Sequence, residues 1–449
     1  MNKRQKKQLS PEMIENQSRR EFILRALRTS GGLGLYSILL NLPPAFLLKG
    51  AMAAETAKYL IFSEHRGACP LNANVPGTYV SGVRHPTGVA FAAADIILGN
   101  TTLQGNRQGA AVWNDLDPEI RARLHFTHHS TRENNHSRSI EVMSVKGAVK
   151  NEEGRATEVI PSAIAQETAA TLGTSQIKPI GFDGVLEFKN IPEGIIRPKA
   201  LKALFDNNLS TTEKQIKDIR DALLDSVYQN VKENGSKAQK TFLDNHVISR
   251  NQAALYTANL GNYLSSVSAN QTEDKIIAAV ALMKIGATPC TRLGFKFGDD
   301  NHKDLDLVTE SQQTINSIAD MNFLWNELKS VNMEDQVVFA LINVFGRTLE
   351  DKRPGNGNDK GRDHNLDHNV GLVFGPGVKP GVSGGLDAAA QNRKAAAFNS
   401  GNGGLSNPDI SYGESHASLA KTIFALCGVN EERIKTRVTA GKIIDNMLL

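Results

Sequence analysis

The pattern of apolar and polar positions is clearest between Val337 and Gly377. The segment Val337–Val344 is a continuous apolar run with β-branched residues, which is typical of a strand buried on both faces. A polar segment rich in Gly, Asn, Asp and Lys follows, and a second apolar run, Val370–Phe374, comes after it. The pattern predicts two buried strands that flank a polar loop. In open α/β sheets such loops lie at the carboxyl ends of strands, where ligands bind.

The rest of the chain alternates between strand-like and helix-like patterns, and its 449 residues suffice for one large α/β domain or two smaller ones. Further strands are predicted at Lys58–Phe62, Leu124–His129 and Ala287–Phe297, and helices at Pro118–Arg123, Ser311–Lys329 and Ser415–Cys427. Asp117 is the expected N-cap of the first of these helices. The strand–helix–strand order predicts parallel βαβ units in a sheet covered by helices on both faces.

Two long segments interrupt this alternation. Residues 150–285 are predicted to be a mainly helical insertion or cap, because apolar positions recur at three-and-four spacing in Lys199–Phe205, Thr211–Lys232 and Gln252–Ser265. The charges of this insertion are expected to form a solvated face. Gly381–Asn407 is rich in Gly, Ala, Ser and Asn and is predicted to be a long loop beside the site.

The N-terminal segment has the order of an export signal. The motif Ser-Arg-Arg-Glu-Phe-Ile occupies residues 18–23, a moderately apolar segment follows at 31–40, and Ala-Met-Ala at 51–53 suits signal peptidase cleavage. We therefore expect residues 1–53 to be a twin-arginine signal peptide and residues 54–449 to be the mature domain, delivered to the periplasm by the twin-arginine translocase. The alternatives are a cytosolic amphipathic helix and an uncleaved membrane anchor. Pro43 and Pro44 interrupt the apolar run, which argues against a transmembrane helix.

The net charge is informative when it is divided along the chain. Residues 1–53 hold nine Lys and Arg residues and three Glu residues, a net charge of +6, so the other residues carry −2 of the total of +4. This nearly neutral body gives no electrostatic case for nucleic-acid binding. Beyond the N-terminal segment no stretch is long and apolar enough to span a bilayer, so we expect no membrane span in the mature protein.

The cysteine count is odd, so at least one of Cys69, Cys290 and Cys427 is unpaired. Cys427 lies in an apolar helical pattern and is expected in the core. A disulfide between Cys69 and Cys290 stays open at this point. The sequence contains no Cys-x-x-Cys motif and no Cys/His spacing typical of zinc sites.

Acidic residues and histidines recur just after predicted strands. Asp300 and His302 follow the strand that ends near Phe297, and Asp363 and His364 lie in the polar loop. A carboxylate and an imidazole that reach one point suit a divalent metal. The alternative is that these are ordinary loop residues in turns. Their recurrence at equivalent positions favours a metal site.

Other histidines are weaker candidates. His136 lies in the loop after a predicted strand, where functional residues are common. His416 lies in the first turn of a predicted helix near the C-terminus. His125, His128 and His129 fall within a predicted strand, where a histidine is more often a satisfied core or edge residue than a ligand.

Three of these motifs resemble those of a known family. They are Asp-Asn-His at 300–302, Phe-Gly-Arg-Thr at 345–348 and Gly-Arg-Asp-His at 361–364. They look like the motifs of a bacterial twin-arginine-exported family, domain of unknown function 1501, which is similar to the alkaline phosphatase and sulfatase superfamily. The resemblance covers most of the mature chain, is strongest from Gly298 to Gly377, and leaves about residues 150–285 unmatched. It implies an alkaline phosphatase-like three-layer sandwich, a mostly parallel central sheet flanked by helices.

The resemblance also implies chemistry. In the superfamily, Asp and His at strand ends hold one or two divalent metals, which activate a phosphate or sulfate ester for attack by a nucleophile. The metal ligands on matching positions would be Asp300, His302, Asp363 and His364, with zinc, calcium or manganese as the metal. Arg347 would be the catalytic residue that pairs with a small anionic substrate. His416 is added as a terminal ligand from its position alone.

The chain departs from the family pattern after its first strand. Cys69 stands where the family has an Asp, which leaves two alternatives: the metal site is weakened, or Glu64 or His65 replaces that carboxylate. The sulfatase signature Cys-x-Pro-x-Arg is missing, and no Ser or Thr nucleophile is evident. Three functions stay open: a metal-dependent hydrolase of phosphate or sulfate esters, a non-catalytic protein that binds a ligand or partner in the envelope, and a structural role in which each His bonds its neighbouring Asp.

Overall fold

The computed structural model describes residues 57–65, 70–203, 260–298, 301–350, 361–387 and 393–449, together with 215, 219, 226, 228–236 and 389. The predicted signal peptide 1–53, Cys69 and Asp300 lie outside the described residues. The chain divides into two compact units: Met1–Lys49 with Arg197–Ser268, and Gly50–Ile196 with Ala269–Leu449. The second unit contains the central sheet and the described candidate site residues.

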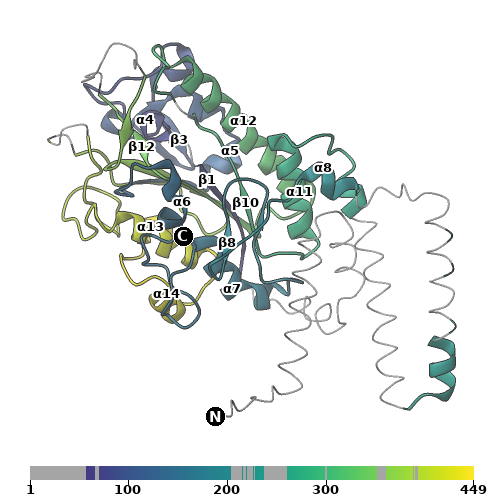
Figure 1. The fold of residues 1–449 in the computed structure, drawn as a ribbon. Coiled ribbons are helices and arrows are strands. Elements are labelled where there is room, and N and C mark those ends of the chain that lie inside the picture. The colour runs from purple at the N-terminus through teal and green to yellow at the C-terminus, as the bar shows by residue number, and fades with distance from the viewer. Residues whose placement is uncertain are drawn as a thin grey trace, which may run out of the picture. The chain divides into compact units, whose positions relative to one another are not determined.

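A seven-stranded sheet, in the order β15-β6-β14-β11-β1-β10-β7, forms the centre of this unit (Figure 1). Its strands are β1 (Tyr59–His65), β6 (Leu124–His129), β7 (Ile180–Gly181), β10 (Cys290–Leu293), β11 (Val337–Asn343), β14 (Asn369–Phe374) and β15 (Gly381–Ser383). In the parallel pairings of β1, Leu60 lies opposite Val338 on one side and Cys290 on the other. β14 is antiparallel to both of its neighbours, β11 and β6, whereas the other pairs are parallel. The sheet is therefore mixed and mostly parallel.

The apolar run that opened the sequence pattern is the strand β11, and all seven of its residues are buried. A central strand that is covered on both faces has no solvent-exposed side, which explains why the run is continuous rather than alternating. This prediction is confirmed, as is the strand Leu124–His129.

Helices cover one face of the sheet through an apolar core. Successive side chains of a strand point to opposite faces, and on this face Phe62 and Ala340 pack in one cluster with residues of three helices. The helices are α7 (Ile160–Leu172), α13 (Ser415–Leu426) and α14 (Glu431–Arg437).

The opposite face is covered largely through aromatic contacts. Trp325 of α12 (Val308–Ser330) meets Phe374 of β14 edge to face, with 6.4 Å between the ring centroids. α11 (Thr272–Lys284) packs beside α12 and β10. A mixed, mostly parallel sheet between two helical layers is an α/β fold compatible with a three-layer sandwich.

The remaining elements are short. The helices are α4 (Leu71–Asn74), η2 (Val89–Phe91), η3 (Gly105–Arg107), η4 (Ala111–Asp115), α5 (Pro118–Arg121), η5 (His136–Arg138), α6 (Ser139–Met143), α8 (Pro198–Ala203) and η6 (Asp445–Met447). The strands are β2 (Ala93–Ala94) with β5 (Gly109–Ala110), β3 (Ile96–Leu98) with β4 (Thr101–Leu103), β8 (Glu187–Phe188) with β9 (Ile191–Pro192), and β12 (Gly346–Arg347) with β13 (His364–Asn365). α5 begins as predicted, because Asp117 Oδ1 accepts the amide hydrogen of Glu119 at 2.8 Å.

The segment predicted as a helical insertion, residues 150–285, is divided between the two units. α7, β7 and α11 belong to the unit of the central sheet, because α7 packs on β1 and β10 and β7 extends the sheet edge. Residues 197–268 fall in the other unit, where α8 is described. The predicted helices Thr211–Lys232 and Gln252–Ser265 lie mostly outside the described residues.

The segment Gly381–Asn407 is not entirely loop. Its first three residues form β15, which pairs in parallel with β6 at the sheet edge. Three residues that begin with Gly after Pro380 give no strand pattern in the sequence, so the pairing comes from the tertiary structure. As for membrane insertion, no helix of the described residues is both long enough and apolar enough to cross a bilayer.

Candidate metal centre

The polar loop between β11 and β14 lies at the carboxyl edge of β11, as the sequence predicted. Because β14 is antiparallel to β11, the connection leaves and re-enters the sheet at this edge. The strands β12 and β13 pair within it and place Arg347 opposite His364. The amide of Thr348 donates to the carbonyl oxygen of Asp363 at 2.8 Å and extends the pairing. Two of the sequence motifs therefore lie on one short hairpin.

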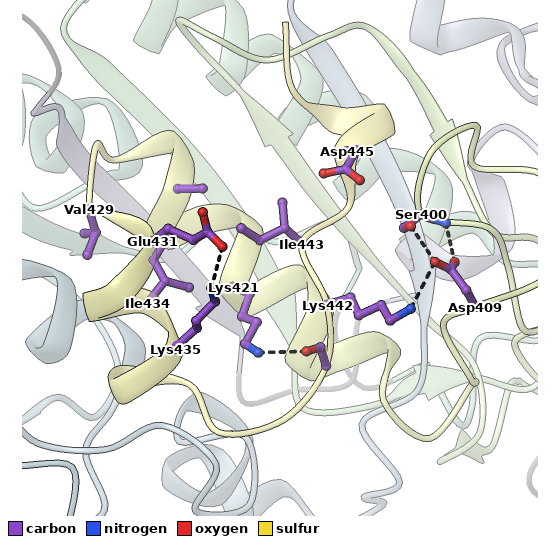
Figure 2. A pocket seen from close by; sticks show the side chains of 12 residues that line it. Ser400, Asp409, Lys421, Val429, Glu431, Ile434, Lys435, Lys442, Ile443 and Asp445 are labelled. Atoms are coloured by element: carbon purple, nitrogen blue, oxygen red, sulfur yellow. Dashed lines mark hydrogen bonds and ion pairs between the residues drawn. The ribbon is translucent and has the colours of Figure 1, made fainter.

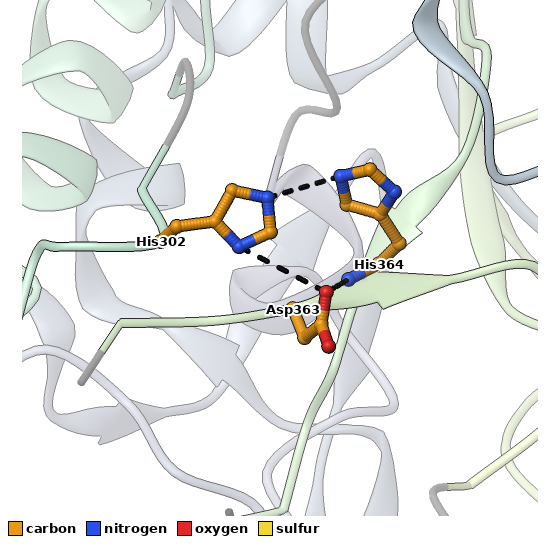
Figure 3. A group of neighbouring side chains, drawn as sticks. All are labelled: His302, Asp363 and His364. Carbon is orange, nitrogen blue, oxygen red and sulfur yellow. Dashed lines mark hydrogen bonds and ion pairs between the residues drawn. The ribbon is translucent and has the colours of Figure 1, made fainter. Parts of the chain in front are cut away.

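His302, Asp363 and His364 form a group of side chains that could hold a metal ion (Figure 3). Each offers one ligand atom, and the three atoms lie within 4.8 Å of one another. Nε2 of His302 is 3.0 Å from Nε2 of His364, and Nδ1 of His302 is 3.8 Å from Oδ1 of Asp363. Two ligand atoms on a tetrahedral zinc ion lie about 3.3 Å apart. The two contacts use different nitrogens of His302, so the observation that bears on a single divalent cation is the grouping of one ligand atom from each residue within 4.8 Å. Two imidazoles with one carboxylate form a ligand set known from catalytic zinc sites.

The ring of His364 is held in one tautomer. Its Nδ1 lies 2.7 Å from the carbonyl oxygen of Asn134, which only accepts, so Nδ1 carries a hydrogen and donates it. In the neutral ring Nε2 then presents its lone pair toward His302. Burial lowers the pKa of His364 and the nearby Arg347 guanidinium lowers it further, whereas the bond to Asn134 raises it. A neutral imidazole oriented by a carbonyl is the form that binds metals.

The carboxylate of Glu310 holds together the segments that carry these ligands. Glu310 lies in the first turn of α12, and its side chain is fully buried. It accepts from Arg362 Nε at 2.8 Å and Nη2 at 3.2 Å, and from the amides of Asn301 and Asn74 at 2.8 Å each. Asn301 and Arg362 each directly precede a candidate ligand in the chain. Bonding to one buried carboxylate therefore fixes the two ligand segments side by side.

Two glycines allow the chain segments to approach this closely. A Cβ atom on Gly361 would lie 1.5 Å from the carbonyl oxygen of Asn301, and one on Gly346 would lie 2.0 Å from the carbonyl oxygen of His368. No side chain fits at either position without displacing backbone. This explains on physical grounds the Gly in the motifs Gly-Arg-Asp-His and Phe-Gly-Arg-Thr.

A chain of hydrogen bonds connects the backbone of Arg347 to β6. Asn72 Oδ1 accepts the Arg347 amide hydrogen at 2.8 Å, and Asn72 Nδ2 donates to the Arg347 carbonyl at 2.9 Å and to His368 Nδ1 at 3.1 Å. His368 Nε2 contacts His128 Nδ1 at 2.9 Å, and His128 Nε2 contacts the carbonyl of Pro76 at 2.9 Å. Because a carbonyl only accepts, each ring is neutral with its one hydrogen on Nε2. His128 is therefore a satisfied core residue, as expected.

Burial keeps the two histidines of this hydrogen-bond chain neutral. It lowers the pKa of His128 to about 4 and that of His368 well below its usual value. His125 on the same strand is satisfied in a similar way, through Lys379 O and Ser383 Oγ at 2.9 Å each.

His136 lies beside the candidate ligands. Its ring meets that of His364 edge to face, with 4.9 Å between centroids, and that of Phe345 at 4.8 Å. The sequence singled out this loop residue, and the structure places it at the site although it is not one of the three grouped ligands.

His416 lies apart from the three grouped ligands. It occupies the first turn of α13, as predicted, but its ring stacks on His129 of β6 with 5.1 Å between centroids. Both rings are buried, and burial lowers the pKa of His416 to about 4. Within the described residues, both ring nitrogens of His129 and Nε2 of His416 make no hydrogen bond. Position along the chain suggested a terminal ligand, but the first turn of α13 packs on the sheet rather than on the polar loop.

The remaining candidates from the sequence either lie outside the described residues or make other contacts. Asp300 lies outside the described residues, as does the side chain of His65. The carboxylate of Glu64 forms a buried ion pair with Arg292 on the neighbouring strand β10 and is not one of the three grouped ligands. Cys290 is a free, buried thiol.

A separate cavity of about 660 Å³ lies among α13, α14 and the C-terminal segment (Figure 2). Its three lysines interact with other lining groups: Lys435 with Glu431, Lys442 with Asp409, and Lys421 with the carbonyl oxygen of Gly441. The lining includes none of the candidate metal ligands.

Sequence reasoning missed Glu310, although a signal for it exists. The buried positions of α12 recur at three-and-four spacing, and they begin with Glu310 and continue through Thr314, Ser317 and Met321. A carboxylate on the buried face of a helix requires a partner. The sequence therefore shows that Glu310 needs a buried partner, but it does not show that the partner is Arg362.

The structure thus brings three of the five predicted metal ligands together and places Arg347 against them, with Nη1 3.1 Å from Nε2 of His302. No protein-family model matches this chain, and no curated protein matches it.

Proposed function

We propose that this chain is an exported periplasmic protein of alkaline phosphatase-like fold that binds one divalent cation through His302, Asp363 and His364. The observation that carries the proposal is the convergence of three ligand atoms, from two separate segments, within 4.8 Å. Their location at the carboxyl edge of a mostly parallel sheet and the twin-arginine-like motif near the N-terminus support it. Two imidazoles suit zinc best and manganese next, whereas calcium prefers oxygen ligands.

We further propose that the site acts on phosphate or sulfate esters. Arg347 lies against the ligands, and a guanidinium beside a cation is suited to bind a tetrahedral anion. A bound cation would polarise the ester and stabilise the charge that develops on its oxygens. Within the chain, Asn134 keeps His364 in its metal-binding tautomer, and Asn72 fixes the backbone from which Arg347 would orient the anion.

The second candidate function is binding without catalysis. The Arg347 side chain is fully buried, and the hydroxyl of the adjacent Thr348 accepts the amide hydrogen of Asp363 at 2.9 Å. The second observation engages the hydroxyl next to Arg347 in the chain, and no other Ser or Thr nucleophile is evident from the sequence, which favours a protein that holds a ligand or partner over an enzyme. A purely structural role has less support, because the His364 ring bonds Asn134 rather than its neighbouring Asp. The distance of 3.8 Å between His302 and Asp363 exceeds a hydrogen bond.

The test is the metal content of the mature protein, starting at Ala54 and purified without chelator or a nickel affinity tag. We expect near-stoichiometric zinc or manganese by elemental analysis, and loss of the metal in His302→Ala, Asp363→Ala and His364→Ala. His416→Ala is the matched control, because it removes a buried imidazole outside the triad and should keep the metal.

The outcomes separate the candidate functions. A folded wild-type protein that contains no metal and takes up none from zinc, manganese or calcium solutions contradicts the metal site. If metal is bound, hydrolysis of p-nitrophenyl phosphate or sulfate that disappears in Asp363→Ala supports the enzyme. A metal-bound protein that binds inorganic phosphate or sulfate but hydrolyses neither ester supports the non-catalytic alternative.

A further inference from the structure

The guanidinium of Arg347 contacts a metal ligand rather than open space. Its Nη1 lies 3.1 Å from Nε2 of His302, the same nitrogen that lies 3.0 Å from Nε2 of His364. A guanidinium only donates, so Nε2 of His302 accepts in this contact and carries no hydrogen. Nε2 of His364 carries none either, because the hydrogen of that ring is on Nδ1 and is donated to Asn134.

Two acceptor nitrogens therefore face each other across 3.0 Å, with the guanidinium of Arg347 as the adjacent cation. An imidazole nitrogen has a single lone pair in the ring plane, so Nε2 of His302 serves either Arg347 or a metal ion. The guanidinium thus occupies the coordination direction that a metal on this nitrogen requires.

Hydrogen bonds hold the backbone of Arg347 in place, so it cannot easily move away from the candidate ligands. Asn72 bonds both its amide hydrogen, at 2.8 Å, and its carbonyl oxygen, at 2.9 Å, and Asn72 is itself held by the buried chain of His368 and His128. The side chain of Arg347 is fully buried, so water screens its charge poorly. A divalent cation on His302 would stay close to this positive charge.

We propose that Arg347 is an internal competitor for the metal site, so that a divalent cation and a tetrahedral oxyanion bind to it with positive coupling. This inference rests on the proposed metal site and deepens it. The anion supplies new acceptors for the displaced guanidinium and negative charge between it and the cation. By thermodynamic linkage, the anion must raise cation affinity by the same factor as the cation raises anion affinity.

The experiment is calorimetric titration of metal-free protein with Zn²⁺, in the presence and absence of sulfate, and the reverse titration. In wild-type protein we expect sulfate to tighten Zn²⁺ binding by about 10-fold or more, within the usual range of binding coupling. Arg347→Met should bind Zn²⁺ more tightly than wild type without sulfate, and sulfate should no longer change its affinity. Arg433→Met on α14 is the matched control and should behave as wild type.

Each outcome decides the inference. Zn²⁺ binding of equal affinity with and without sulfate overturns the coupling while leaving the metal site intact. Failure of both wild type and Arg347→Met to bind Zn²⁺ overturns the proposed metal site and the inference with it. If Arg347→Met does not fold, the wild-type titrations with and without sulfate still decide whether the anion raises the Zn²⁺ affinity.

Discussion

Glu310→Gln is the substitution that most directly tests how the candidate site is held. The side chains of Glu310 and Arg362 are 0% and 2% exposed, so the ion pair between them is fully desolvated. Glutamine keeps the volume but removes the charge and presents an NH2 group where a donor is already directed. Breaking a buried ion pair by removing one partner costs about 3–5 kcal/mol. For a folded unit of this size, that loss lowers Tm by about 4–7 °C.

The same substitution should weaken metal binding, although Glu310 touches no metal ligand. Asn301 and Arg362 lose a common acceptor, and they directly precede two of the ligands in the chain. Loss of such outer hydrogen bonds typically lowers metal affinity by about 10- to 100-fold. Calorimetric titration with Zn²⁺ measures this effect, and thermal unfolding followed by circular dichroism measures the loss of stability.

Glu167→Gln is the matched control for this experiment. Glu167 on α7 also accepts from arginines, Arg433 at 2.6 Å and Arg437 at 2.6 Å, but these belong to α14. It should lose stability and keep the zinc affinity of wild type. The reasoning is refuted if Glu310→Gln binds zinc as tightly as wild type, or if both variants lose the same affinity, since the effect would then be general destabilisation.

The other predictions concern acid stability and close packing. Burial lowers the pKa of several histidines to about 4, among them the buried His125, His128 and His416. Between pH 6.5 and 4 the unfolded chain binds more protons than the folded protein, so the free energy of unfolding that these neutral histidines contribute above pH 6.5 should be lost as the pH falls. The expected loss is roughly 4 kcal/mol per pH unit for the three together. A free energy of urea unfolding that does not change from pH 7 to pH 5 would contradict this. Gly361→Ala should unfold the hairpin or abolish zinc binding, whereas Gly194→Ala, where a Cβ meets nothing within 4 Å, should leave Tm and zinc titrations unchanged. Asn72→Ala leaves the amide and carbonyl of Arg347 and one ring nitrogen without their partner, which should cost about 2–4 kcal/mol in urea unfolding.

Sequence reasoning succeeded where a local pattern determines the structure. The continuous apolar run at β11 implied two covered faces, and Asp and His just after predicted strands implied side chains at one edge. It was less successful where contacts between residues far apart in the sequence determine the structure. β15 is a three-residue strand that exists because β6 is beside it, and α7 joins the central unit because its apolar face packs on β1. His416 shows the same limit, since its chain position does not say which side of the sheet its helix covers.

Two histidine pairs in this structure show why residue type alone does not identify a metal ligand. His128 and His368 lie 2.9 Å apart, and His302 and His364 lie 3.0 Å apart. In the first pair one outer nitrogen donates to a carbonyl and the other accepts from an amide, so a single hydrogen lies between the rings. In the second pair Nδ1 of His364 donates to a carbonyl and Nε2 of His302 itself accepts from Arg347, so neither facing nitrogen carries a hydrogen and a cation is suited to bridge them. Zinc should therefore shift the imidazole ¹⁵N resonances of the second pair and leave those of the first unchanged, and equal shifts in both pairs would refute this assignment of hydrogens.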